Sequence, residues 1–128
     1  MPFKTFIVED NRSIRDSLAE ALSELAGMET IGTAASEKAA VAWLTNPQHE
    51  WDLAIIDLTL EPGGSGFGVL HALRNRGPSR SVVVLTATAN PAVRAHCRSL
   101  GSDGVFDKSM ETDDLIEYCA GLARAAQR

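Results

Sequence analysis

The chain has 128 residues, of which 45% are apolar and 23% are charged, a balance typical of one globular domain. Its net charge of −5 opposes an extensive contact with nucleic acid or an anionic membrane, and no apolar run reaches the roughly 18 residues that a transmembrane helix needs. The N-terminus becomes acidic too early for a secretory signal, so we expect one cytoplasmic domain over residues 1–128 that binds neither nucleic acid nor membranes directly.

The first elements along the chain are a strand, a helix and a weaker strand. Residues 6–8 form a continuous apolar run, which is typical of a buried strand in a parallel sheet. A helix follows, because apolar side chains recur at helical spacing until Gly27 ends the pattern. These apolar side chains are Ile14, Leu18, Leu22 and Leu25. The small and polar residues at 29–35 predict a strand at the edge of the sheet.

The middle of the chain predicts a helix, a buried strand and another helix. Ser36 is a residue type that caps helices, and the helix after it ends at an Asn-Pro pair. The apolar run at 53–56 predicts a buried strand that leads directly into Asp57. A third helix is expected over 67–75, since a Gly-Pro pair stops the pattern shortly afterwards.

The last part of the chain repeats the same alternation. The runs at 82–85 and 105–106 predict two further strands. Between them, Asn90 and the following proline are typical of the cap and first position of a helix, which we place at 91–100. A fifth helix is expected over 112–125, where apolar side chains recur on one face.

Strand and helix therefore alternate five times along the sequence. This alternation is typical of the α/β class, in which right-handed crossovers place helices on both faces of a parallel sheet. We expect a flavodoxin-like (βα)5 fold with three layers and the strand order 2-1-3-4-5.

Polar side chains follow four of the five predicted strands. The first strand is followed by Glu9 and Asp10, the third by Asp57, the fourth by Thr86 and the fifth by Lys108. In the order 2-1-3-4-5 these four strands are neighbours, and ligands of open parallel sheets bind at the carboxyl ends of the strands. We therefore expect three carboxylates, one hydroxyl and one ammonium group to share a single shallow cleft.

This combination of side chains has a chemical meaning. Clustered carboxylates repel one another unless a cation lies among them, and oxygen ligands of this kind suit Mg²⁺. A carboxylate at such a site is a known nucleophile toward phosphoryl groups, and it forms an aspartyl-phosphate. A lysine and a hydroxyl group then bind the other phosphoryl oxygens. The pattern therefore indicates phosphoryl transfer with Mg²⁺ as the cofactor and Asp57 as the acceptor.

Each of these residues also has a simpler interpretation on its own. An acid at the end of a strand is often a helix cap, as Glu9 and Asp10 could be for the first helix. A single residue such as Thr86 or Lys108 is often only a solvated polar group. The coincidence of suitable residue types at four strand ends favours the functional interpretation.

Two other motifs receive structural interpretations. The segment GGSGFG at 63–68 resembles a phosphate-binding loop, but it lacks the lysine of that motif and does not follow the first strand. With Pro62 before it, this segment predicts a mobile loop set out from the sheet. A small basic cluster around a turn is expected to be solvated; it consists of Arg74, Arg76 and Arg80.

With these residues in order, the sequence resembles the receiver domains of bacterial two-component response regulators over essentially its whole length. The motifs that carry the resemblance are Glu9 with Asp10, then Asp57, Thr86 and Lys108. The resemblance implies that Asp57 takes a phosphoryl group from the phosphohistidine of a histidine kinase or a histidine phosphotransfer protein.

The same resemblance implies the ligands of the metal ion. Asp10 and Asp57 would bind Mg²⁺ directly, and Glu9 would act mainly through water. The backbone carbonyl of Thr59 would complete the protein ligands.

The resemblance places the output surface on the fourth helix, the fifth strand and the fifth helix, which would also be a possible homodimer contact. Because no segment follows the last predicted helix, we expect a stand-alone receiver domain, with no output domain and with a separate downstream protein partner. Three features differ from the family pattern. Ser109 stands where proline is frequent, Val105 stands where an aromatic residue is common, and one extra residue precedes the loop glycine Gly66.

We expect a signalling phosphoacceptor and not an enzyme, apart from slow autophosphorylation and autodephosphorylation. Two alternatives stay open at this point. One is a Mg²⁺-dependent phosphohydrolase with an aspartate nucleophile, although Thr59 offers no carboxyl group as a general acid two residues after Asp57. The other is a binding module that uses the same fold without phosphorylation.

Overall fold

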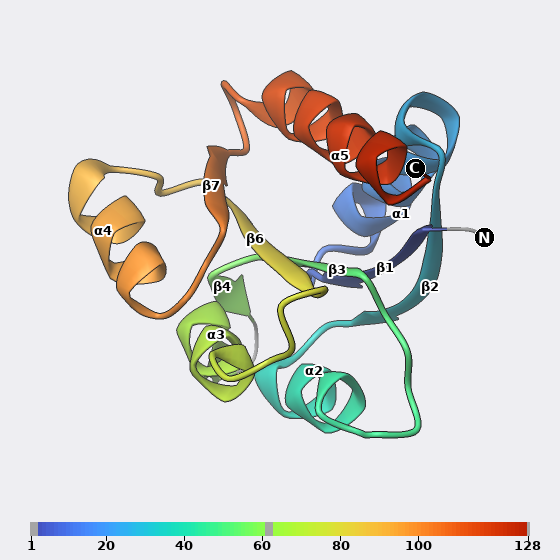
Figure 1. Ribbon diagram of the computed structural model, residues 1–128. Helices are drawn as coiled ribbons and strands as arrows, with labels where there is room; N and C mark the ends of the chain where they lie inside the picture. Colours follow the sequence, from blue (N-terminus) through green and yellow to red (C-terminus); the bar gives the residue numbers. More distant parts are fainter. Residues whose placement is uncertain (1–2, 61–62, 128) are drawn as a thin grey trace.

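The computed structural model describes residues 3–60 and 63–127 and contains a parallel sheet of five strands (Figure 1). These strands are β1 (Phe3–Val8), β2 (Met28–Ala34), β3 (Leu53–Ile56), β6 (Ser81–Thr86) and β7 (Gly104–Asp107). Their order in the sheet is β2-β1-β3-β6-β7. The predicted order 2-1-3-4-5 is confirmed, because β4 (Thr59–Leu60) and β5 (Gly64–Ser65) form a separate pair outside this sheet.

Helices cover both faces of the sheet and make the three-layer, flavodoxin-like arrangement that the sequence predicts (Figure 1). The helices are α1 (Arg12–Ala26), α2 (Glu37–Leu44), α3 (Gly66–Leu73), α4 (Pro91–Ser99) and α5 (Thr112–Ala126). α1 and α5 lie on one face, and α2, α3 and α4 lie on the other. Within 3–60 and 63–127, no helix has both the length and the apolar composition needed to cross a bilayer.

The central strand β3 is buried on both faces of the sheet. Leu53 and Ile55 pack with α1 and α5, whereas Ala54 and Ile56 pack with the helices of the opposite face. This alternation follows from the period of two in a strand. The residue after Ile56 is therefore presented at the middle of the sheet, at the carboxyl ends of its strands.

The apolar stripe predicted for α1 is partly wrong. Leu22 is buried as expected, but Ile14 is 37% exposed and Leu25 is 67% exposed. The last turn of α1 packs through Ala26 instead, because the chain turns back into β2 at Gly27. The φ angle of Gly27 is 66°, a left-handed conformation that glycine adopts without steric cost.

The prediction of a solvated basic cluster is wrong for Arg76. Its side chain is 11% exposed and forms an ion pair of 2.7 Å with Asp103. The same guanidinium donates hydrogen bonds to the backbone carbonyls of Leu73, Arg80 and Gly101. Arg76 therefore ties the end of α3 to the loop between α4 and β7.

The connection from β3 to α3 contains a hairpin that the sequence does not predict. The antiparallel pairs of β4 and β5 are Thr59 with Ser65 and Leu60 with Gly64. Leu60 is buried in the core, so the hairpin packs on the domain. The prediction that this segment is set out from the sheet is wrong for Leu60, which packs in the core, while Pro62 lies outside the described residues.

Candidate functional site

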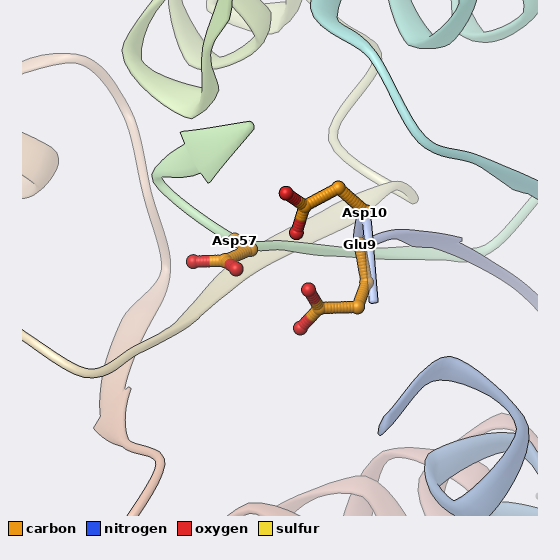
Figure 2. A group of neighbouring side chains, drawn as sticks. All are labelled: Glu9, Asp10 and Asp57. Atoms are coloured by element: carbon orange, nitrogen blue, oxygen red, sulfur yellow. The ribbon is translucent and has the colours of Figure 1, made fainter. Parts of the chain in front are cut away.

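Three carboxylates gather at the carboxyl ends of β1 and β3 (Figure 2). The N–H of Glu9 donates to the carbonyl of Ala34 at 3.0 Å, and the N–H of Asp57 donates to the carbonyl of Val8 at 2.9 Å, so both acids continue the hydrogen bonding of the sheet. Glu9 and Asp57 are buried, and Asp10 is half-buried. One oxygen from each carboxylate lies within 4.8 Å of the others, which confirms the predicted meeting of these acids.

The ammonium group of Lys108 joins two of these acids. Its Nζ atom lies 2.6 Å from Oε1 of Glu9 and 2.8 Å from Oδ2 of Asp57. Lys108 reaches them from the end of β7, where its N–H donates to the carbonyl of Thr86 at 2.9 Å. Two buried carboxylates are stable side by side only with a compensating cation, and Lys108 supplies one positive charge.

Burial and charge shift the pKa values in this group. Burial raises the pKa of Glu9, and the charge of Asp57 adds to the rise, although hydrogen bonds from Lys108 and from the N–H of Asn11 oppose it. Burial alone would lower the pKa of Lys108, but its hydrogen bonds to Asp57 and Glu9 outweigh burial, and the pKa is raised. Lys108 is therefore protonated at neutral pH and supplies one positive charge beside three carboxyl groups.

Thr86 and Thr59 lie next to this charged group. Thr86 ends β6, and its buried Oγ1 atom is 3.2 Å from Oγ1 of Thr88 and accepts a hydrogen bond from the N–H of Thr88 at 3.3 Å. Thr59 begins β4, and its N–H donates to Oδ1 of Asp57 at 3.3 Å. Thr59 thus contacts Asp57, and Thr86 contacts the backbone of Lys108; the roles predicted for the two threonines stay predictions.

Gly66 is a residue of the site whose importance the sequence pattern does not explain. It begins α3, and its N–H donates to the carbonyl of Leu58 at 3.0 Å. A Cβ atom added to Gly66 would lie 2.2 Å from the carbonyl oxygen of Asp57 and 2.7 Å from Cα of Leu58. Only glycine leaves room for α3 to begin directly against the backbone of Asp57. The spacing of Gly66 after Asp57 can be recognised in the sequence, but its close contact with the backbone of Asp57 is visible only in the three-dimensional structure.

The donor set fits a small divalent cation. Mg²⁺ binds oxygen ligands at about 2.1 Å in octahedral geometry, so two ligands of one ion lie about 3 to 4.2 Å apart. The carboxylate oxygens of Glu9, Asp10 and Asp57 lie within 4.8 Å of one another, close to this range. All three side chains offer oxygen ligands, and carboxyl groups clustered in this way favour a cation among them. The three acids could therefore hold a metal ion directly or through water.

A comparison with models of protein families matches residues 5–120 to the response regulator receiver domain. The match covers most of the chain and includes the acids, Thr86 and Lys108. The chain belongs to this family. The receiver domain predicted from the sequence is thereby confirmed, and receiver domains generally bind Mg²⁺ at an acidic pocket like the one described above.

Curated relatives of this receiver domain are named as regulators. Response regulator RppA of Synechocystis is 32% identical over an alignment of 108 residues that covers 77% of this chain and 46% of the relative. Acid tolerance regulatory protein ActR of Rhizobium meliloti is 31% identical over 110 residues, 86% of this chain and 54% of the relative. Two-component response regulator PhoP of Pseudomonas aeruginosa is 30% identical over 121 residues, 94% of this chain and 52% of the relative. This receiver domain spans about half the length of these relatives.

Solved structures share the fold over nearly the whole chain. The phosphorylated cyanobacterial phytochrome response regulator RcpA has a TM-score of 0.76 and 26% identity, with 95% of this chain and 91% of that chain covered. The Mn²⁺-bound form of response regulator Rcp1 has a TM-score of 0.73 and 25% identity, with coverages of 94% and 91%. The receiver domain of Francisella response regulator 1452 has a TM-score of 0.81 at 23% identity, with coverages of 96% and 98%.

Proposed function

We propose that this receiver domain accepts a phosphoryl group on Asp57 from the phosphohistidine of a histidine kinase or a histidine phosphotransfer protein. A carboxylate oxygen of Asp57 attacks the phosphorus, the P–O bond forms as the P–N bond breaks, and the imidazole leaves and takes up a proton from solvent. The observation that carries this proposal is the buried carboxylate of Asp57, held by Lys108 beside two further acids. A carboxylate nucleophile with charge neutralisation around it is what transfer to an aspartate needs.

Mg²⁺ is the proposed cofactor of this transfer. Asp10 and Asp57 would bind it directly, Glu9 through water, and Thr59 through its backbone carbonyl. When bound, the ion neutralises negative charge on the carboxylates and on the incoming phosphoryl oxygens. The donor set described above supports this assignment, since its oxygens lie close enough together for one ion.

Lys108 and Thr86 are the proposed contacts of the phosphoryl oxygens. The ammonium group of Lys108 already touches Oδ2 of Asp57 and supplies a fixed positive charge beside the acceptor. The hydroxyl group of Thr86 ends the neighbouring strand β6 and would exchange its contact with Thr88 for a phosphoryl oxygen. Both residues would thus respond to the phosphoryl group, and both are connected to the loops that leave β6 and β7.

Two similar structures support the chemistry. RcpA, at 26% identity, is described in a phosphorylated form, and Rcp1, at 25% identity, in a Mn²⁺-bound form. A phosphoryl group and a divalent cation are the two ligands proposed for this chain. The relatives named as regulators favour a signalling role over catalytic turnover. We place this role in the cytoplasm and propose a protein as the downstream partner.

The output surface is proposed on α4, β7 and α5, which are the fourth helix, the fifth strand of the parallel sheet and the fifth helix. Arg94 of α4 connects the parts of this surface. Its guanidinium donates to the carbonyl of Ala89 at 3.0 Å and to the carbonyl of Val105 at 2.9 Å, and it pairs with Glu111 before α5. A movement of the loop after Thr86 would therefore pull on β7 and α5 through Arg94, although Val105 is not the aromatic residue common in the family.

Amide hydrogen exchange with Mg²⁺ and beryllofluoride, a mimic of the phosphoryl group, tests both the acceptor and the output surface. In the wild type, exchange should change across residues 86–110 and at the start of α5, because a ligand shifts such an equilibrium by about 1–3 kcal/mol. Asp57→Ala should show no change, and Arg94→Ala should confine the change to the loop after β6. Changes limited to α2 and α3 in the wild type would show that the output surface has been misplaced.

A second prediction concerns the metal. Asp10→Asn should raise the melting temperature of the metal-free protein by about 4 °C, equivalent to about 1 kcal/mol, because it removes repulsion among the acids. The same substitution should reduce the rise in melting temperature that Mg²⁺ causes. Thermal melts with and without Mg²⁺ measure both effects, and Glu24→Gln, on an exposed part of α1, is the matched control. An unchanged Mg²⁺ effect in Asp10→Asn would exclude Asp10 as a ligand.

A further inference from the structure

The glycine-rich segment 63–68, which includes β5, contacts a carboxylate from another part of the chain. Glu37, the first residue of α2, directs its carboxylate toward the N-terminus of α3, where Oε1 accepts a hydrogen bond from the N–H of Ser65 at 2.9 Å. A Cβ atom added to Gly68 would lie 2.2 Å from Oε2 of Glu37, and one added to Gly64 would lie 3.0 Å from Cβ of Glu37. The segment 63–68, which resembles a phosphate-binding loop, is therefore packed against the carboxylate of Glu37.

The β4–β5 hairpin connects the contact between Glu37 and Ser65 to the metal site, because Ser65 lies in β5 and Thr59 lies in β4. Ser65, which binds Glu37, pairs in β5 with Thr59 in β4. The N–H of Thr59 donates to Asp57, and the next residue after Ser65 is Gly66, which lies against the backbone of Asp57. A displacement of β5 would therefore move Thr59 relative to the acids.

We propose that Glu37 is a positioning residue of the metal site, which holds the β4–β5 hairpin so that the backbone of Thr59 meets the ion. This inference rests on the proposed function, because it assumes that Mg²⁺ binds at the acids. Glu37 is not a member of the acidic group itself, which consists of Glu9, Asp10 and Asp57 among the described residues. It acts through Ser65 and the glycines around it.

Physical chemistry favours this position for a carboxylate. The N-terminus of a helix carries partial positive charge and backbone N–H groups without helical partners, so an anion there is stabilised. A hydrogen bond from an N–H to a charged carboxylate is stronger than one to a neutral oxygen. Gly64 and Gly68 allow the close approach, because a side chain at either position would meet Glu37.

Isothermal titration of Mg²⁺ into purified variants tests the proposal. Glu37→Ala should weaken Mg²⁺ binding about tenfold, which is the lower end of the range for residues that orient metal ligands without contacting the metal. Glu37→Gln should retain most of the affinity, because the amide oxygen still accepts from Ser65. Gly68→Ala, which displaces the carboxylate while keeping Glu37, should weaken binding as Glu37→Ala does. Lys38→Ala, exposed and next in the chain, should match the wild type.

The double variant Glu37→Ala, Gly68→Ala separates positioning from general destabilisation. Since both changes act on one contact, the double variant should bind Mg²⁺ no more weakly than either single variant. Normal Mg²⁺ affinity in Glu37→Ala, or equal losses in Glu37→Ala and Glu37→Gln, would overturn the role of the hydrogen bond. If the wild type itself bound no Mg²⁺, the proposed function would fail, which is a distinct result.

Discussion

Replacing Lys108 with alanine should lower the free energy of unfolding of the metal-free protein by about 3 kcal/mol. The side chain of Lys108 is 19% exposed and its ammonium group pairs with both Glu9 and Asp57, whose side chains are 4% and 7% exposed. Removal of the cation leaves two buried carboxylates facing each other without compensation. Urea denaturation of the wild type and of Lys108→Ala, both without metal, measures the difference.

Mg²⁺ should return part of this lost stability, because a divalent cation can replace the missing positive charge. The increase in unfolding free energy on adding Mg²⁺ should therefore be larger in Lys108→Ala than in the wild type. Lys4→Ala is the matched control, since Lys4 pairs with Glu50 at 3.4 Å on the surface and such pairs contribute at most about 1 kcal/mol. If Lys108→Ala were as stable as Lys4→Ala, Lys108 would be a solvated residue without a role in the acidic group.

The second large effect is expected at Gly66. Gly66→Ala should lower the free energy of unfolding by about 3 kcal/mol, the upper part of the usual range for overpacking, because the new Cβ atom meets backbone that cannot rotate away. The nearest atom is the carbonyl oxygen of Asp57, at 2.2 Å. The start of α3 and the backbone of Asp57 must then separate, so phosphoryl uptake should fall as well.

Gly77→Ala is the control for this substitution. No atom lies within 4 Å of a Cβ added at Gly77, so alanine there should leave stability unchanged or raise it slightly through the unfolded state. Urea denaturation and the rate of phosphoryl uptake should be compared for the two variants. Equal stability of Gly66→Ala and Gly77→Ala would show that α3 is not packed against Asp57 as described.

The sheet and the meeting of the charged residues could be predicted because both follow from the order of elements. Continuous apolar runs indicate buried parallel strands, and the strand order then brings the residues after Val8, Ile56 and Asp107 to one edge. The sequence pattern does not predict that Lys108 pairs with both Glu9 and Asp57 in the metal-free protein. That contact depends on side-chain directions at the ends of β1, β3 and β7.

Contacts between elements far apart in sequence could not be predicted. Glu37 and Ser65 are 28 positions apart, and Arg76 and Asp103 are 27 positions apart, so no local pattern connects them. An arginine near a turn is usually solvated, but Arg76 pairs with Asp103 and donates hydrogen bonds to three backbone carbonyls. The sequence does not predict the β4–β5 hairpin, because strands of only two residues are too short to show a periodic pattern.

The most direct test of the phosphoacceptor role of Asp57 is the intact mass of the protein after incubation with acetyl phosphate and Mg²⁺. The wild type should gain the mass of one phosphoryl group, which base removes, and omission of Mg²⁺ should prevent the gain. Asp57→Ala should gain nothing, while Asp52→Ala, at the opposite end of β3, should behave as the wild type. A phosphoryl group retained by Asp57→Ala, or a wild type that never gains one, would contradict the assignment.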